Sequence, residues 1–208
     1  MTGIPGAALL VLAGYLIGAI PVGLMIGRLV GGIDLRQHGS GRTGATNTLR
    51  TIGIPWALGV FVLDLAKGAL PVLLVGWLYS AGPAGSPAWV AAAAGVAAIG
   101  GHVRSVFIRF TGGRGVATFV GAMFTTAPLV VAVVIPLALL IIWRTRFVSL
   151  GSLSGAVLAP VATALLVASG RAELAGVGLA AGGAAVVIAA HADNIARLRA
   201  GTERRLGR

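Results

Sequence analysis

Long apolar segments alternate with short polar ones along the chain, and their lengths match the roughly 20 residues that a membrane-spanning helix needs. Five such segments are residues 4–29, 54–80, 87–106, 147–169 and 173–191. The apolar stretch 115–143 is too long for one span and is interrupted at Thr125 and Pro128. It therefore predicts two shorter helices, 115–126 and 128–143. The pattern predicts an all-α integral membrane protein, a bundle of seven transmembrane helices with short, glycine-rich cytoplasmic motif loops.

The composition agrees with a membrane protein. Hydrophobic residues make up 57% of the 208 residues and charged residues 10%, whereas a soluble domain carries about 25% charged residues. The first apolar segment lacks a basic leader and a cleavage site, so we expect a retained helix and not a signal peptide. Cysteine is absent, and the three histidines and five acidic residues are scattered, so we expect no metal site and no cofactor. A single membrane-embedded domain over residues 1–208 is expected, and a monomer is compatible with the sequence.

Basic residues are concentrated in alternate loops between the apolar segments and in the C-terminal tail. With seven spans, fourteen of the sixteen fall on one side of the membrane: Arg28, Arg36, Arg42, Arg50, Arg104, Arg109, Arg114, Arg144, Arg146, Arg197, Arg199, Arg204, Arg205 and Arg208. The opposite loops, 81–87 and 169–173, contain only Arg171. Because cytoplasmic loops hold the excess of Lys and Arg, the N-terminus is predicted outside and the C-terminus inside. The net charge of +11 then reflects topology and attraction to the lipid bilayer, and not nucleic-acid binding.

Residues 39–50, GSGRTGATNTLR, form the first of four polar clusters on the basic side. Gly39 and Gly41 permit positive φ, which allows successive backbone N–H groups to converge on an anion. Arg50 offers a planar fork for phosphate. The candidate phosphate-binding residues are Gly39, Ser40, Gly41, Thr46, Asn47 and Arg50. The alternative is a flexible cytoplasmic turn.

The second cluster, DLAKGALP at 64–71, lies inside a predicted span. Asp64 and Lys67 are one helical turn apart and are expected to pair. The pair either fastens the bundle or holds an ammonium group that reaches a negatively charged substrate, and ionisable groups inside a membrane favour the functional alternative. Gly68 and Pro71 are expected to loosen the helix and free carbonyl groups toward a cavity.

The third cluster comprises His102 and the segment FTGGRGVAT at 110–118. Three glycines precede a predicted helix, whose free N–H groups and dipole favour an anion. The candidate residues of this turn are Gly112, Gly113, Arg114 and Gly115. The turn predicts an oxyanion site at the level of the lipid headgroups, although the GxxxxGK(S/T) pattern of nucleotide-binding loops is absent.

The fourth cluster, HADNIARLRAGTE at 191–203, closes the last span. His191 and Asn194 share a helix face and point toward the bundle if the helix continues. The alternative for His191 is an interfacial histidine with a satisfied hydrogen bond. Surface ion pairs are expected for Asp193 with Arg197 and for Glu203 with Arg204 or Arg205.

In their order and spacing the four clusters resemble the bacterial acyl-phosphate:glycerol-3-phosphate acyltransferase family, often called PlsY. The resemblance covers nearly the whole chain through GSGRTGATNTLR, DLAKGALP, GH…F..FTGGRGVAT and HADNI.RL..GTE. It implies a seven-helix enzyme of the bacterial inner membrane, with its N-terminus outside. Such an enzyme transfers a fatty acyl group from acyl phosphate to the 1-hydroxyl of glycerol 3-phosphate. The products are 1-acyl-glycerol 3-phosphate (lysophosphatidic acid), used in phospholipid synthesis, and phosphate.

The resemblance also implies roles for particular residues. Catalytic roles follow for the positions that match the family's functional serine, arginine, histidine and asparagine: Ser40, Arg50, His191 and Asn194. Substrate binding follows for the positions that match its second and third motifs: Asp64, Lys67, Gly68, His102, Gly112, Gly113 and Gly115. Four positions differ from the family's usual residues. Arg42 stands in place of asparagine, Ser105 in place of proline, Arg114 in place of lysine and Ala192 in place of a basic residue.

Three questions stay open at the level of sequence. His191 either accepts the proton of the attacking hydroxyl as a general base or only positions it while a substrate phosphate oxygen takes the proton, and the resemblance favours the second route. A small organic-anion transporter is an alternative, disfavoured because the polar residues gather at one face and no inverted repeat is found. A diverged relative with altered or lost activity is the third possibility.

Overall fold

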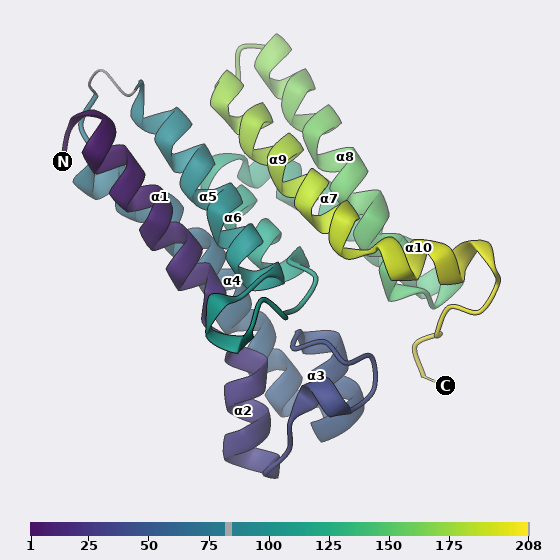
Figure 1. Ribbon diagram of the computed structural model, residues 1–208. Helices are drawn as coiled ribbons and strands as arrows, with labels where there is room; N and C mark the ends of the chain where they lie inside the picture. The colour runs from purple at the N-terminus through teal and green to yellow at the C-terminus, as the bar shows by residue number, and fades with distance from the viewer. Residues whose placement is uncertain (82–84, 208) are drawn as a thin grey trace.

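The computed structural model describes residues 1–81 and 85–207, which form ten α-helices and two short 3-10 helices (Figure 1). The α-helices are α1 Gly3–Ala19, α2 Val22–Gly31, α3 Ala45–Ile52, α4 Ile54–Leu78, α5 Pro87–Val103, α6 Val116–Thr126, α7 Pro128–Thr145, α8 Val148–Ala168, α9 Leu174–Ala190 and α10 Ala192–Arg199. The 3-10 helices are η1 Leu35–Gln37 and η2 Val106–Ile108. Part of the predicted loop 81–87, and Arg208 of the basic tail, lie outside the described residues.

Six of the seven predicted apolar segments are confirmed as single helices, with ends shifted by a few residues, whereas segment 4–29 forms α1 and α2. Pro128 begins α7 directly after α6, because the first turn of a helix tolerates a residue without an N–H group. Four helices are long and apolar enough to cross a membrane when α1 and α2 count as one, and α9 with α10 forms a fifth, bent by 60°. α5 and α6 are shorter apolar helices. The chain is therefore an all-helical, multi-pass membrane protein.

Three local features differ from the prediction. The first span is interrupted between α1 and α2, at Pro21, which has no N–H group to continue the helical hydrogen bonds. Residues 45–52 form α3, although the sequence predicted a loop there. α4 runs continuously through Pro71 as one helix, although the sequence predicted a looser helix there. Pro71 has no N–H group for the carbonyl of Lys67, so a carbonyl freed toward a cavity stays a prediction.

Glycines permit the close crossing of α4 and α6. A Cβ atom on Gly68 would overlap the carbonyl oxygen of Thr118, and one on Gly121 would overlap that of Leu65. In lipid, small residues let helix backbones approach closely. Gly68 therefore has a packing role, whatever its relation to a substrate. Further contacts join α1 to α5, α5 to α9, and α8 to both α7 and α9.

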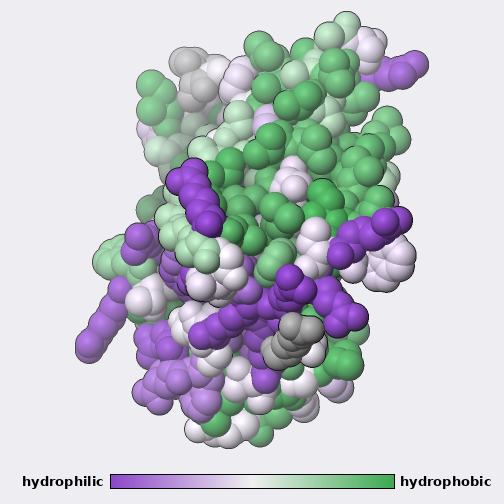
Figure 2. All heavy atoms as spheres, turned by 90° about the vertical axis from the view of Figure 1, so that its right-hand side faces the viewer, coloured by the Kyte–Doolittle hydropathy of each residue, from purple (hydrophilic) through white to green (hydrophobic). Residues whose placement is uncertain are grey.

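The polar motifs gather at one end of the bundle. In Figure 1 the N-terminus and the start of α5 lie at the upper left, whereas α2 and α3 form the lower end and α10 projects to the right above α3, from the lower end of α9. Figure 2 shows hydrophilic side chains collected over the lower part of the molecule, below a largely apolar surface. The first, third and fourth clusters therefore belong to the polar end, whereas the second lies buried inside α4.

Candidate active site

The first motif is organised by the buried side chain of Asn47 on α3. Its Nδ2 donates hydrogen bonds to the carbonyl oxygens of Leu35, His38 and Arg42 at 2.9, 3.0 and 2.8 Å. Its Oδ1 accepts a hydrogen bond from the N–H of Ser40 at 2.9 Å. The amide thus shapes the loop that carries Ser40, and both of its polar atoms are engaged in doing so.

Left-handed glycines complete this loop. Gly39 and Gly41 have φ of +57° and +69°, a conformation that glycine adopts without strain. A Cβ atom on Gly39 would also overlap Oδ1 of Asn47. The glycines predicted to shape a phosphate-binding loop therefore do produce its bends.

Guanidinium groups from separate motifs lie close to each other beside this loop. Burial, and next repulsion from Arg114, lower the pKa of Arg42. Burial, and next repulsion from Arg204, lower the pKa of Arg50, with a smaller contribution from Arg114. The tertiary structure therefore brings cations of the first motif, the glycine-rich turn and the C-terminal tail into one region, where Asp193 and Glu203 offset part of their positive charge.

Asp64 and Lys67 form the predicted pair inside α4. Nζ of Lys67 lies 2.9 Å from Oδ1 of Asp64, and the side chains are buried. The same Nζ donates to the carbonyl oxygen of Ile20, at the break between α1 and α2, at 2.8 Å. Nδ1 of His102, on α5, lies 3.5 Å from Oδ1 of Asp64. The pair therefore joins α4 to the break between α1 and α2 and lies next to His102 without a hydrogen bond to it. Its contact with a substrate stays a prediction.

The glycine-rich turn folds tightly against His102. The N–H of Gly113 donates to the His102 carbonyl at 3.1 Å, and a Cβ atom on Gly113 would overlap the imidazole. A Cβ atom on Gly112 would overlap the same carbonyl oxygen. Gly115 has φ of +79° and precedes α6. The turn thus requires its glycines, and it leaves the free N–H groups of the first turn of α6 at the polar end.

Arg114 reaches from this turn to the junction of α9 and α10. Nη1 and Nη2 donate to Oδ1 and Oδ2 of Asp193 at 2.7 and 2.9 Å, and Nη1 also donates to the Ala190 carbonyl at 2.8 Å. These hydrogen bonds hold the pKa of Asp193 well below its usual range. The predicted pair of Asp193 with Arg197 is confirmed at 3.1 Å. Arg114 was not expected as its main partner.

His191 and Asn194 lie on either side of the 60° bend between α9 and α10. Nδ1 of the buried His191 lies 2.8 Å from the Val187 carbonyl. Since a carbonyl only accepts, Nδ1 carries the proton and Nε2 is left as an acceptor. Nδ2 of Asn194 donates to Oε1 of Glu203 at 2.6 Å. Oδ1 of Asn194 is buried and has no hydrogen-bond partner among the described residues.

Glu203 joins the C-terminal tail to this bend. Oε1 also accepts from Oγ of Ser149 at 2.8 Å, and Oε2 from Nε of Arg197 at 2.7 Å. Burial alone would raise the pKa of Glu203, but hydrogen bonds from these residues and Asn194 lower it. The predicted surface pairing of Glu203 with an arginine directly after it is wrong, because the side chain turns inward and is only 6% exposed.

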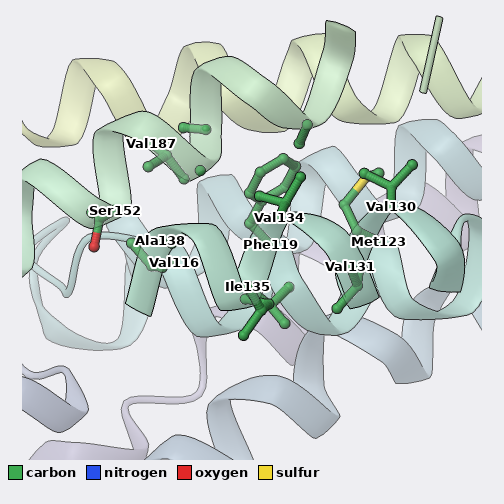
Figure 3. Close-up of a pocket in the computed structure, with 15 residues that line it drawn as sticks. Val116, Phe119, Met123, Val130, Val131, Val134, Ile135, Ala138, Ser152 and Val187 are labelled. Carbon is green, nitrogen blue, oxygen red and sulfur yellow. The ribbon is translucent and has the colours of Figure 1, made fainter. Parts of the chain in front are cut away.

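An apolar cavity of about 50 Å³ adjoins the polar end, between α6, α7, α8 and α9 (Figure 3). Its lining includes Phe119, Met123 and Val134, whose side chains Figure 3 shows together in its centre. Val116, the first residue of α6, lines it next to the glycine-rich turn. Val187, whose carbonyl accepts from His191, lines it as well. The polar site and the apolar cavity therefore share an edge.

Known proteins decide the family. A sequence model of the family described as "Glycerol-3-phosphate acyltransferase" matches residues 8–201. The chain belongs to the glycerol-3-phosphate acyltransferase family. A curated glycerol-3-phosphate acyltransferase of Synechococcus sp. (strain JA-3-3Ab) is 48% identical over 201 residues, covering 97% of this chain and 94% of that relative. One of Halalkalibacterium halodurans is 40% identical over 200 residues, covering 96% and 95%.

Solved structures agree with this assignment. A crystal structure of PlsY, an integral membrane glycerol 3-phosphate acyltransferase, in its glycerol 3-phosphate form is similar with a TM-score of 0.84 and 36% identity, covering 97% of this chain and 96% of that chain. The lysophosphatidic acid form is similar with a TM-score of 0.83 and 35% identity, covering 97% and 95%. The chain is therefore a membrane glycerol-3-phosphate acyltransferase.

Two further polar side chains that the sequence did not single out lie beside the candidate residues. Thr118, on α6, is fully buried, and its Oγ1 has no hydrogen-bond partner among the described residues; the same holds for Nδ1 of His102. Thr118 stands at the end of the glycine-rich motif, so its position was a usable signal. Ser149 gave no such signal, because its partner Glu203 is distant in sequence and meets it only in the folded chain.

Proposed function

We propose that the acyltransferase takes its acyl group from acyl phosphate and transfers it to the 1-hydroxyl of glycerol 3-phosphate. The hydroxyl oxygen bonds to the acyl carbonyl carbon, and the bond between that carbon and the phosphate oxygen breaks. The hydroxyl proton leaves with the phosphate, so the products are 1-acyl-glycerol 3-phosphate and inorganic phosphate. Both substrates carry phosphate, and the donor also carries an apolar chain.

The shared edge of the polar site and the apolar cavity is the observation that carries this proposal. Val116 joins the cavity to the glycine-rich turn, and Val187 joins it to His191. A donor whose phosphate binds at the turn can therefore direct its acyl chain toward the apolar lining of this cavity, where a few of its carbon atoms fit, while its carbonyl carbon lies near His191. A site for a fully polar substrate has no need of that arrangement.

Each motif has a distinct task in the proposal. The donor phosphate is held by the N–H groups of the 112–115 turn together with Ser40, Arg50 and Arg114. Glycerol 3-phosphate enters from the cytoplasm on the side of Lys67, and His191 and Asn194 orient it. The carbonyl oxygen gains negative charge during attack, and fixed donors stabilise this charge most when they are preorganised.

The proton is transferred to a phosphate oxygen in this proposal, with His191 positioning the hydroxyl. Acyl phosphate is already activated, so orientation and charge stabilisation supply much of the rate acceleration. His191 is able to accept a hydrogen bond through Nε2, because Nδ1 is engaged by the Val187 carbonyl. A hydroxyl directed toward that nitrogen is oriented without full proton transfer.

Phosphate release by the purified chain in a lipidic medium tests the function. We expect release from acyl phosphate only when glycerol 3-phosphate is present, with matching formation of the acylated product. Release that is independent of the acceptor, or none at all, would contradict the proposal. His191→Gln is expected to keep measurable activity. A fall in rate of about 10²- to 10⁴-fold, typical of the loss of a general base, would instead show that His191 accepts the hydroxyl proton.

We also propose that the acyltransferase is one domain over 1–208 in the bacterial inner membrane, with seven crossings, its N-terminus outside and its C-terminus in the cytoplasm. The crossing elements are α1 with α2, α4, α5, α6, α7, α8 and α9. Arginines gathered at one end support the orientation. α6 has 11 residues and covers about 16 Å, about half of a hydrocarbon core of roughly 30 Å. Its crossing is therefore the one that most needs a direct test.

A further inference from the structure

Arg114 holds a carboxylate in the geometry with which arginine binds phosphate. Nη1 and Nη2 donate in parallel to the two oxygens of Asp193 at 2.7 and 2.9 Å. The planar fork of a guanidinium matches two oxygens of a carboxylate or of a phosphate. Asp193 therefore occupies the face of Arg114 that a phosphate group needs.

Asp193 has a second cation within reach. Its Oδ2 lies 3.1 Å from Nη1 of Arg197, one turn further along α10, and its side chain is 42% exposed. The carboxylate has room to turn toward Arg197 and stay paired. Glu203 has no such freedom, because its side chain is only 6% exposed and accepts hydrogen bonds from three residues. Asp193 is thus the more exposed of the two carboxylates, and both of its side-chain partners are arginines.

Arg114 keeps its position when the carboxylate moves. Its Nη1 also donates to the Ala190 carbonyl at 2.8 Å, and its side chain is mostly buried. A mostly buried charge needs a counter-charge close to it, and Asp193 supplies one to Arg114.

We propose that Asp193 is an internal counter-ion that sets the affinity of the acyltransferase for phosphate groups. Its carboxylate holds the Arg114 fork when no phosphate is bound and turns to Arg197 when a phosphate enters. Every phosphate must displace this carboxylate, and its binding is weakened accordingly. This inference rests on the proposed function, in which a phosphate group binds beside Arg114.

Displacement of Asp193 costs the donor and the product the same free energy, so it does not change the ratio of their affinities. An acyl phosphate also buries apolar area in the neighbouring cavity, and this burial offsets the cost for the donor. Inorganic phosphate gains polar contacts alone. Asp193 therefore keeps inorganic phosphate weakly bound and promotes release of the phosphate that the reaction produces.

Direct binding of inorganic phosphate to the purified full-length chain in a neutral maltoside detergent tests the proposal without turnover. Calorimetry gives Kd for the wild type, Asp193→Asn and Asp193→Ala. Removal of the carboxylate is expected to tighten binding by at least about fivefold, the lower end of common coupling between two ligands. Glu173→Gln removes one negative charge next to the opposite end of α9 and is expected to leave Kd unchanged. Unchanged or weaker binding in both Asp193 variants would overturn the proposal.

A double-mutant cycle separates competition for Arg114 from a general charge effect. In an Arg114→Gln background, Asp193→Asn is expected to produce no further gain in phosphate affinity. A gain that persists in this background would also overturn the proposal.

Acyl transfer is assayed separately on the same preparations. Tighter phosphate binding in the Asp193 variants, without acyl transfer from acyl phosphate, would support the counter-ion role of Asp193 and contradict acyl phosphate as the donor. Normal acyl transfer with unchanged phosphate affinity in these variants would support the donor and contradict the counter-ion role.

Discussion

Asn47 determines the shape of the first motif through one side chain. The buried side-chain amide of Asn47, in the first turn of α3, bonds to backbone groups of Leu35, His38, Ser40 and Arg42 along the loop. The sequence predicts Asn47 as a ligand for substrate phosphate, because an asparagine in a glycine-rich segment can either bind a ligand or hold the loop in shape. The structure gives both polar atoms of its side chain intramolecular partners, so we expect Asn47 to affect substrate binding only through the position of Ser40.

Replacement of Asn47 by alanine is expected to destabilise the acyltransferase by at least about 2 kcal/mol, because buried backbone groups that lose a partner cost about 1–3 kcal/mol each. Thermal unfolding in detergent measures this loss. Thr46→Ala, on the same turn of α3, is the matched control and should change stability by less than about 0.5 kcal/mol. Equal unfolding temperatures for the two variants would show that the amide does not organise the loop.

At the scale of elements, the crossing of α4 and α6 brings the second and third motifs together. Gly68 on α4 meets the backbone of Thr118 on α6, within the same helical turn as the Asp64–Lys67 pair. The close approach of these backbones places the pair next to the glycine-rich turn through His102. A glycine that the sequence linked to substrate binding therefore acts as a contact between helices.

Gly68→Ala is expected to destabilise the acyltransferase by about 1–3 kcal/mol, since the added methyl group forces the two helices apart. Gly76→Ala in the same helix is the control: no atom lies within 4 Å of a Cβ atom there, and alanine is favoured over glycine in a helix by up to about 1 kcal/mol. Thermal unfolding compares the variants. A Gly68→Ala protein as stable as the Gly76→Ala protein would contradict the described crossing.

For the whole molecule, the proposed topology makes a prediction that the chain is well suited to test, because it contains no cysteine. Single cysteines at Ser80, Ser169 and Thr126 are expected to react with a membrane-impermeant thiol reagent added outside intact cells. A cysteine at Thr202 should react only after the cells are opened. The first two positions follow α4 and α8, and the third lies at the end of α6.

Labelling of a cysteine at Thr126 shows whether α6 crosses the membrane. Reaction from outside, in step with Ser80, supports a crossing by this short helix. Protection from outside, with normal labelling at Ser80 and Ser169, would show that α6 enters the membrane and does not cross it, so the count of seven crossings would be wrong.

The fold was largely predictable because membrane helices are specified locally. A continuous apolar run predicts a helix in lipid, where every backbone polar group must be satisfied within the segment, and Pro128 marked the end of one helix correctly. Pro21 interrupts the first run in the same way, but the apolar residues on both sides concealed it. α3 was missed because its eight residues are polar on one face and flanked by glycines that suggest a turn.

The candidate site was predictable as a set of residues but not as a set of contacts. The order and spacing of four polar clusters identified the family, and this identification held. The pairing of Arg114 with Asp193, the inward turn of Glu203 and the complete engagement of Asn47 were not foreseen. Each of these contacts either joins residues that are distant in sequence or forms with one of several polar groups that lie near each other in sequence.

The sequence by itself thus determined that the chain is a helical membrane acyltransferase, because apolar length and motif order are properties of short segments. Only the tertiary structure decided which charged groups are paired and which polar atoms remain free for a substrate. That choice depends on distances between helices, which close packing at residues such as Gly68 sets and which no single segment contains.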